Sequence, residues 1–202
     1  MRSRPELAGE RVRVALVAGA DAAALLAFHT RNRDHLKPWM PPLPADFFRP
    51  RYWRRWAAEA RPLFDQDRAV RLAIRPDGGG DGAIIGQINL SNIVRGPLQA
   101  CHLGYHIDRD AEGGGLMHEA MQLVTAWAFG RMGLHRLMAN YQPGNARSAG
   151  LLERLGFEVE GFAKAYLFID GAWRDHVLTA LTNPDPTPPP ASTATTAGRR
   201  PA

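Results

Sequence analysis

The chain has 202 residues, of which 45% are hydrophobic and 22% are charged, a balance that excludes fibrous, collagen-like and wholly disordered proteins. No apolar run reaches the roughly 18 residues of a membrane-spanning helix, and residues 1–17 lack the apolar core of a signal peptide, so we expect a cytoplasmic protein with no membrane partner. The 25 Lys and Arg residues against 20 Asp and Glu residues give a net charge of +5, which permits an anionic ligand or a ribonucleoprotein partner but requires neither.

The apolar pattern alternates between the periodicity of strands and that of helices. In chain order it predicts a strand at 11–17, a helix after Asp21, a proline-rich break at 37–44, a helix at 52–63, strands at 69–74, 83–94 and 101–107, a helix at 116–132, a strand at 136–141, a helix at 146–155 and two strands within 166–181. Tight turns are expected at DGGGDG (77–82) and at Asp170-Gly171. This order predicts an α+β fold with a mixed sheet.

Three further features each allow a structural and a functional interpretation. The basic side chains Arg51, Arg54, Arg55 and Arg61 lie mostly off the apolar stripe of the helix at 52–63, which would suit RNA, an acidic protein or simply solvent. The single cysteine, Cys101, excludes an internal disulfide and is expected on the core side of its strand. His102 and His106 share the opposite side of that strand, but no third ligand has defined spacing, so we expect no metal.

Three consecutive glycines come directly before the helix at 116–132. Gly113, Gly114 and Gly115 would let backbone N–H groups converge on an anion at the positive end of the helix dipole. A plain tight turn is the alternative. The dinucleotide pattern GxGxxG fails because residue 118 is His, and the GK[ST] ending of a P-loop is absent.

The next segments resemble the GCN5-related N-acetyltransferase (GNAT) superfamily. Its phosphate loop reads Q/R-x-x-G-x-G/A and its next strand and helix read N-x-x-S/A-x-x-L-x-x-x-x-G-F, which Asn145 to Phe157 match here. Segments 31–39, 135–148 and 170–182 resemble the members that acetylate the N-terminal alanine of the fifth protein of the small ribosomal subunit. The likeness spans about 8–182, so we expect a GNAT domain at 1–182 and a disordered Pro/Thr/Ala-rich tail at 183–202. It implies a GNAT fold, a mostly antiparallel twisted sheet with helices on both faces and a splayed cofactor cleft.

The resemblance also implies acetyl-CoA as cosubstrate and direct acetyl transfer to an amine. The backbone of Tyr105 and Ile107 would pair with the pantetheine arm like an added strand. Asn145 would contact the arm near the thioester. The pyrophosphate would be held by backbone N–H groups of Gly113, Gly114, Gly115, Leu116 and Met117.

Three positions depart from the family pattern. Glu112 occupies the Q/R position, and a carboxylate beside a pyrophosphate is repulsive unless it turns away to solvent. Met117 occupies a position that is usually small. Leu152 stands where many members place a tyrosine that protonates the departing thiolate, so the side chain at 152 cannot be that donor.

Ser148 is the remaining hydroxyl near the expected thiolate, and we assign it as hydrogen-bond donor or general acid, with a helix-capping role as the alternative. Glu119 and His106 are candidates for holding a water that accepts the amine proton; the alternative for Glu119 is a helix-surface charge or a hydrogen bond to a neighbouring strand. An α-amine has a pKa of about 7.7 to 8.0, so a strong base is less necessary. We expect the acceptor groove to be bordered by Asn89, Tyr166 and Asp175.

The resemblance therefore predicts an acyltransferase that acetylates the N-terminal alanine of a small-subunit ribosomal protein, with the assembling subunit as a further partner and no specific DNA. Two alternatives stay open. One is a GNAT enzyme for a small amine such as a polyamine or an aminoglycoside. The other is a ribosome-assembly binding module with weak catalysis, which Glu112, Leu152 and the basic helix would favour.

Overall fold

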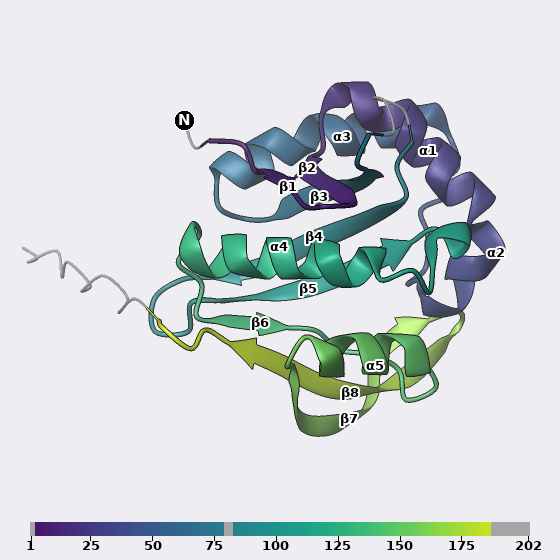
Figure 1. Ribbon diagram of the computed structural model, residues 1–202. Coiled ribbons are helices and arrows are strands. Elements are labelled where there is room, and N and C mark those ends of the chain that lie inside the picture. The colour runs from purple at the N-terminus through teal and green to yellow at the C-terminus, as the bar shows by residue number, and fades with distance from the viewer. Residues whose placement is uncertain (1–2, 79–82, 187–202) are drawn as a thin grey trace, which may run out of the picture.

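A twisted, mostly antiparallel sheet forms the centre of the protein (Figure 1), which we describe from a computed structural model covering residues 3–78 and 83–186. Within these ranges eight strands pair in the order β1-β2-β3-β4-β5-β6-β8-β7. The strands are β1 (Glu6–Ala8), β2 (Val12–Leu16), β3 (Val70–Pro76), β4 (Gly86–Val94), β5 (Ala100–Ile107), β6 (Arg136–Met138), β7 (Glu158–Ile169) and β8 (Ala172–Thr182).

Helices cover both faces of the sheet, each over its own apolar core. The helices are α1 (Ala22–Arg31), α2 (Arg33–Leu36), α3 (Pro50–Asp65), α4 (Leu116–Gly130) and α5 (Ala146–Arg154), with short 3-10 turns at Gly19–Asp21, Lys37–Trp39 and Arg109–Ala111. In Figure 1, α4 and α5 lie in front of the sheet and α1 and α3 behind it. One core lies beneath α4 and α5, and the other beneath α1 and α3. None of the helices in the described ranges has the length and apolar character needed to span a membrane.

The sheet splits between β5 and β6. These two strands are its one parallel pair in the described residues, and they pair only over Ala100–His102 against Arg136–Met138. Beyond His102, β5 continues for five residues that pair with β4 on one side only. An unpaired strand edge of this kind leaves backbone donors and acceptors open to a ligand.

Most predicted elements are confirmed, and the exceptions have local causes. Strand β1 is too short to carry a periodic signal. Strand β7 begins at Glu158, well before the predicted 166. Two register shifts break the alternation of its side chains, and Ala165 has a φ of 48°, so the first part of the strand carries no periodic signal. The strand predicted at 136–141 ends at Met138. Residues 79–82 of the turn expected at 77–82, and residues 187–202 of the expected tail, lie outside the described residues.

Candidate active site

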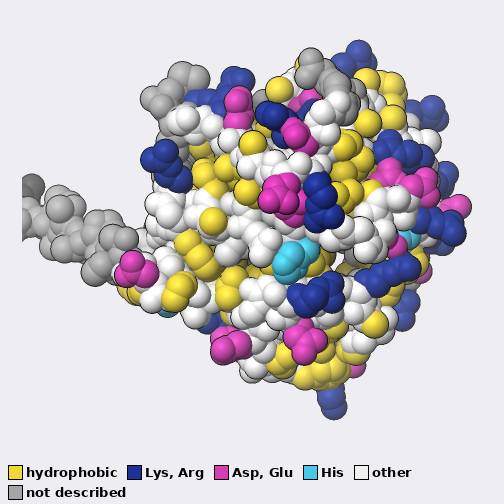
Figure 2. All heavy atoms as spheres, in the orientation of Figure 1, with side chains coloured by type: hydrophobic (Ala, Val, Ile, Leu, Met, Phe, Trp, Pro, Cys, Tyr) yellow, Lys and Arg dark blue, Asp and Glu magenta, His cyan; other side chains and the backbone are white. Residues whose placement is uncertain are grey.

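A cavity of about 1050 Å³ occupies the split in the sheet, and the face shown in Figure 2 is hollowed near its centre. The N-terminal end of α4, the first turn of α5 and the segment around Trp39 surround it together with the free edge of β5. Of the residues singled out from the sequence, it is lined by Tyr105, His106, Ile107, Gly113, Gly115, Leu116, Met117, Asn145 and Ser148. Segments far apart in the sequence therefore converge where the family resemblance expects the cosubstrate.

The glycine turn before α4 has the backbone conformation that the sequence predicts. Gly113 and Gly115 have φ values of 76° and 79°, in the left-handed region that side chains with a Cβ rarely adopt. A Cβ on Gly113 or Gly114 would meet open space. The turn thus leaves its backbone accessible at the N-terminus of a 15-residue helix, where N–H groups and the helix dipole favour an anion. The side chain of Met117 is buried in the core, so its size does not obstruct this backbone.

Arg11, close to the N-terminus of the chain, is hydrogen-bonded to this loop. Arg11 Nη1 donates to the carbonyl oxygen of Gly114 at 2.7 Å, and its Nε donates to Glu119 Oε2 at 2.9 Å. Glu119 Oε1 accepts the backbone N–H groups of Arg11 at 2.9 Å and Val12 at 3.3 Å. These hydrogen bonds, chiefly that from the Arg11 amide, hold the pKa of Glu119 below its usual value.

The hydrogen bonds of Glu119 agree with a structural role for its side chain. Its carboxylate fastens α4 to β2, and it does not line the cavity. The geometry therefore agrees with the alternative of a bond to a neighbouring strand. Arg11, which the sequence reasoning missed, does line the cavity.

Glu112 does not turn away to solvent, the arrangement expected to relieve repulsion of a pyrophosphate. Its side chain is 18% exposed; the carboxylate forms an ion pair with Arg147 Nη1 at 2.5 Å and lies 3.1 Å from His35 Nε2. The two partners come from α2 and from the first turn of α5. The repulsion expected beside a pyrophosphate is thus offset by the guanidinium of Arg147. A second cavity of about 500 Å³ lies among these three residues, Arg109 and Gly113.

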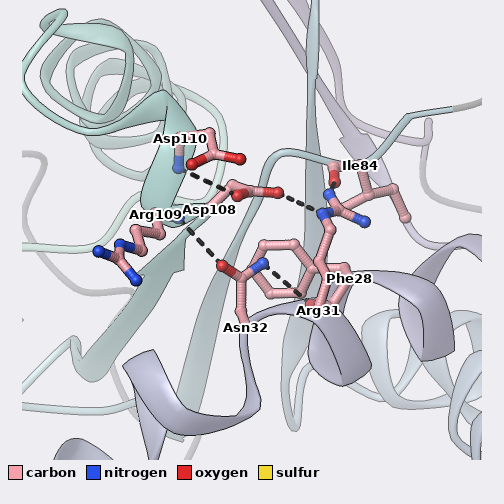
Figure 3. A network of polar contacts seen from close by, with 7 residues as sticks. All are labelled: Phe28, Arg31, Asn32, Ile84, Asp108, Arg109 and Asp110. Atoms are coloured by element: carbon pink, nitrogen blue, oxygen red, sulfur yellow. Dashed lines mark hydrogen bonds and ion pairs between the residues drawn. The ribbon is translucent and has the colours of Figure 1, made fainter.

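A polar network behind the loop fixes its starting point (Figure 3). Asp108, at the end of β5, accepts from Arg31 Nε at 2.5 Å and from the Asp110 amide at 3.2 Å. Asn32, which is 1% exposed, accepts the Arg109 amide at 3.0 Å and donates to the Phe28 carbonyl at 2.9 Å. The end of α1 thereby holds the segment that leads into Glu112 and the glycines.

Ser148 meets a phenol rather than capping its helix. Asn145 is the N-cap of α5, and its Oδ1 accepts the Ser148 amide at 3.1 Å. The Ser148 hydroxyl is hydrogen-bonded to the Tyr105 hydroxyl with 2.6 Å between the oxygens, and both residues line the cavity. Leu152 is 1% exposed within the core.

The opposite face of β5 brings His106 to the cavity. Its ring lies 6.2 Å from that of His29, which is hydrogen-bonded to Gln87 at 2.5 Å and stacked on Trp53. Burial lowers the pKa of His106 to about 4 and that of His29 to about 3, so both are neutral near pH 7. Among the described residues, no three His, Cys, Asp or Glu side chains converge as a metal site would require.

The three residues expected at the acceptor groove do not line the cavity. Asn89 lies on β4, paired with Gly104 of β5. Asp175 Oδ1 accepts the Ala165 amide at 2.8 Å, and so stabilises the irregular part of β7. The ring of Tyr166 packs on that of His176, and His176 lines the cavity. His35, Asn140, Arg147 and His176 are lining residues for which the sequence carried no local signal.

Comparisons with known proteins agree with this geometry. The acetyltransferase (GNAT) domain family matches residues 11–158. The [ribosomal protein uS5]-alanine N-acetyltransferase of Escherichia coli is 45% identical over 183 residues, which cover 90% of this chain and 93% of that protein.

Solved structures give the same result. Ribosomal-protein-S5-alanine acetyltransferase from Vibrio fischeri matches with a TM-score of 0.86 and 38% identity, over 91% of this chain and 100% of the other. RimJ from Mycobacterium smegmatis, solved in complex with CoA-disulfide, matches with a TM-score of 0.81 and 30% identity, over 91% and 90%. The predicted GNAT fold is thus confirmed, and the chain belongs to the GNAT family of acetyltransferases.

Proposed function

We propose that this protein transfers the acetyl group of acetyl-CoA to the N-terminal alanine of ribosomal protein uS5. The observation that carries the proposal is the 45% identity to the Escherichia coli [ribosomal protein uS5]-alanine N-acetyltransferase over 90% of this chain. We further propose that the reaction takes place in the cytoplasm, on free uS5 or on uS5 within the assembling subunit.

The residues of the cavity fit acetyl-CoA. The free edge of β5 offers backbone groups of Tyr105 and Ile107 to an extended amide-containing arm. The loop from Gly113 to Met117 offers its amides to a pyrophosphate, and Arg11, Arg147 and Arg154 line the same cavity. When bound, acetyl-CoA supplies an acetyl group activated as a thioester. Asn145, as the N-cap of α5, keeps Ser148 at the cavity wall.

The charge of the cavity favours an α-amine as acceptor. Among the described lining residues, Glu112 is the one carboxylate, and its oxygens already contact His35 and Arg147. The cavity therefore offers a cationic amine little stabilisation, and the neutral amine is also the nucleophile. With a pKa near 8, about a quarter of an α-amine is neutral at pH 7.5, against about one lysine side chain in a thousand. This difference favours N-termini over lysines and polyamines.

The test is acetylation of a peptide that carries the N-terminal sequence of uS5. We expect release of CoA and a mass increase of one acetyl group on the N-terminal alanine. The matched control is the same peptide with a blocked N-terminus and a free lysine, which should not react. Turnover with a polyamine or an aminoglycoside, but not with the peptide or the intact ribosomal protein, would show that the acceptor is a small amine and not uS5.

Calorimetry with acetyl-CoA separates an enzyme from a binding module. We expect micromolar affinity, because the ion pair with Arg147 offsets the charge of Glu112 at the loop. Absence of binding would favour the binding-module alternative.

A further inference from the structure

The hydroxyl pair of Tyr105 and Ser148 joins two elements that are far apart in the sequence. Tyr105 lies on the free edge of β5, and Ser148 is in the first turn of α5. Their oxygens are 2.6 Å apart at the wall of the cavity. The amide of Ser148 is itself held by the N-cap Asn145, so the position of the serine is fixed from both its backbone and its side chain.

The relative acidity of the two hydroxyls favours one direction for this hydrogen bond. A phenol is a stronger acid than an aliphatic hydroxyl, so the phenol is the better donor and the serine oxygen the better acceptor. Burial is the main cause that raises the pKa of Tyr105, to about 12, and its phenol therefore stays protonated throughout the pH range of an assay. A serine hydroxyl has one proton and two lone pairs. With one lone pair occupied by the phenol, the serine directs its own proton elsewhere.

We propose, on the basis of the proposed function, that Tyr105 is a positioning residue that donates a hydrogen bond to Ser148 and so directs the serine proton toward the sulfur of CoA. Tyr105 thereby takes the place of the tyrosine that is absent at position 152, acting through a serine instead of directly. A hydroxyl that accepts one hydrogen bond also becomes a better donor of the next, because the two bonds polarise each other.

The proton balance of the reaction agrees with this role. Acetyl transfer forms a bond between the amine nitrogen and the acetyl carbon, and it breaks the bond between that carbon and sulfur. The electron pair of the broken bond stays on sulfur, which gains one proton in total, while the nitrogen loses one. Tyr105 keeps its own proton throughout and is therefore not itself the acid.

The first experiment titrates CoA bound to the protein and needs no acceptor. The ultraviolet absorbance of the thiolate reports the pKa of the bound thiol. Ser148→Ala should raise that pKa, and Tyr105→Phe should raise it by a similar amount, about one unit, or tenfold in the ionisation constant. Tyr52→Phe removes a phenol hydroxyl from α3, away from the cavity, and should leave the bound thiol unchanged. An unchanged pKa in Tyr105→Phe, or no binding of CoA by the wild-type protein, overturns the proposal.

The second experiment measures acetylation of the N-terminal alanine peptide. Tyr105→Phe should lower kcat by about tenfold, whereas KM for acetyl-CoA should stay within about twofold, because the phenol acts only as sulfur departs. The double variant Tyr105→Phe/Ser148→Ala should be no slower than Ser148→Ala alone, since one hydroxyl acts through the other. Effects that multiply in the double variant would show that the two act independently. If the peptide is not acetylated at all, the proposed acceptor fails, while the titration still decides the role of Tyr105.

Discussion

Replacing Asp108 by Ala should destabilise the protein and weaken its affinity for acetyl-CoA together. The side chain of Asp108 is 9% exposed and pairs with Arg31, whose side chain is 41% exposed. Breaking a fully buried pair costs about 3–5 kcal/mol, and the exposure of Arg31 places the expected loss near the lower limit, at about 3 kcal/mol. For a folded unit of this size each kcal/mol corresponds to about 2–4 °C, so thermal unfolding should occur about 6–12 °C lower.

The same substitution should raise KM for acetyl-CoA, because the segment from Asp108 to Glu112 leads into the glycine turn. Burial acts to raise the pKa of Asp108, but the hydrogen bonds from Arg31 and the Asp110 amide outweigh it, and the net pKa is lowered. A lowered pKa means that the pair stabilises the fold above the ordinary pKa of aspartate, about 3.9, and that this contribution is lost as the pH falls further. The difference in Tm between wild type and Asp108→Ala should therefore shrink below about pH 4.

The matched control is Asp110→Ala. The side chain of Asp110 is exposed, and its backbone amide can still donate to Asp108 in the variant. Thermal unfolding of the control should stay within about 2 °C of wild type. If differential scanning calorimetry finds that Asp108→Ala unfolds at the same temperature as Asp110→Ala, the assignment of Asp108 as the anchor of the loop is refuted.

Three shorter predictions concern neighbouring residues. Gly115→Ala should cost about 1–2 kcal/mol in a chemical denaturation series, because its φ is 79° and its Cβ would lie 3.3 Å from a guanidinium, whereas Gly114→Ala should cost less, since its Cβ meets open space. Glu119→Ala should raise KM for acetyl-CoA and lower Tm, because β2 loses its hydrogen bonds to α4; an unchanged Tm would contradict this. Cys101, whose pKa burial raises to about 12, should resist alkylation in the native protein and react after unfolding, as mass spectrometry would show.

Elements with a strong periodic pattern could be located from the sequence, and those without one could not. Strand β2 and helix α4 each repeat their apolar residues at the period of their own structure, and both are confirmed near the predicted bounds. Strand β7 shows the opposite case. Its bulges turn successive side chains out of alternation, and the first half of the strand then has no periodic signal.

The site divides in the same way. The glycine turn and the N-cap Asn145 act through the backbone next to them, so a local motif reveals them. The partners of Glu112 and of Glu119 come from segments up to 108 residues away, and which cation meets which carboxylate depends on the folded arrangement. Sequence reasoning could therefore detect the unusual charge at Glu112 but could not tell what neutralises it.

The short parallel pairing of β5 and β6 has a consequence for how the fold opens. Three residue pairs are the only ladder across the middle of the sheet in the described residues, and the next five residues of β5 have no strand partner on that side. Amides there that point into the split must bond to water, which gives them little protection from hydrogen exchange. A ligand that pairs with this edge as a strand would bridge the two parts of the sheet, so its binding energy would be added to the cohesion between them. The candidate pocket thus lies beside one of the shortest ladders of the sheet, and filling it should slow exchange on both sides of the split at once.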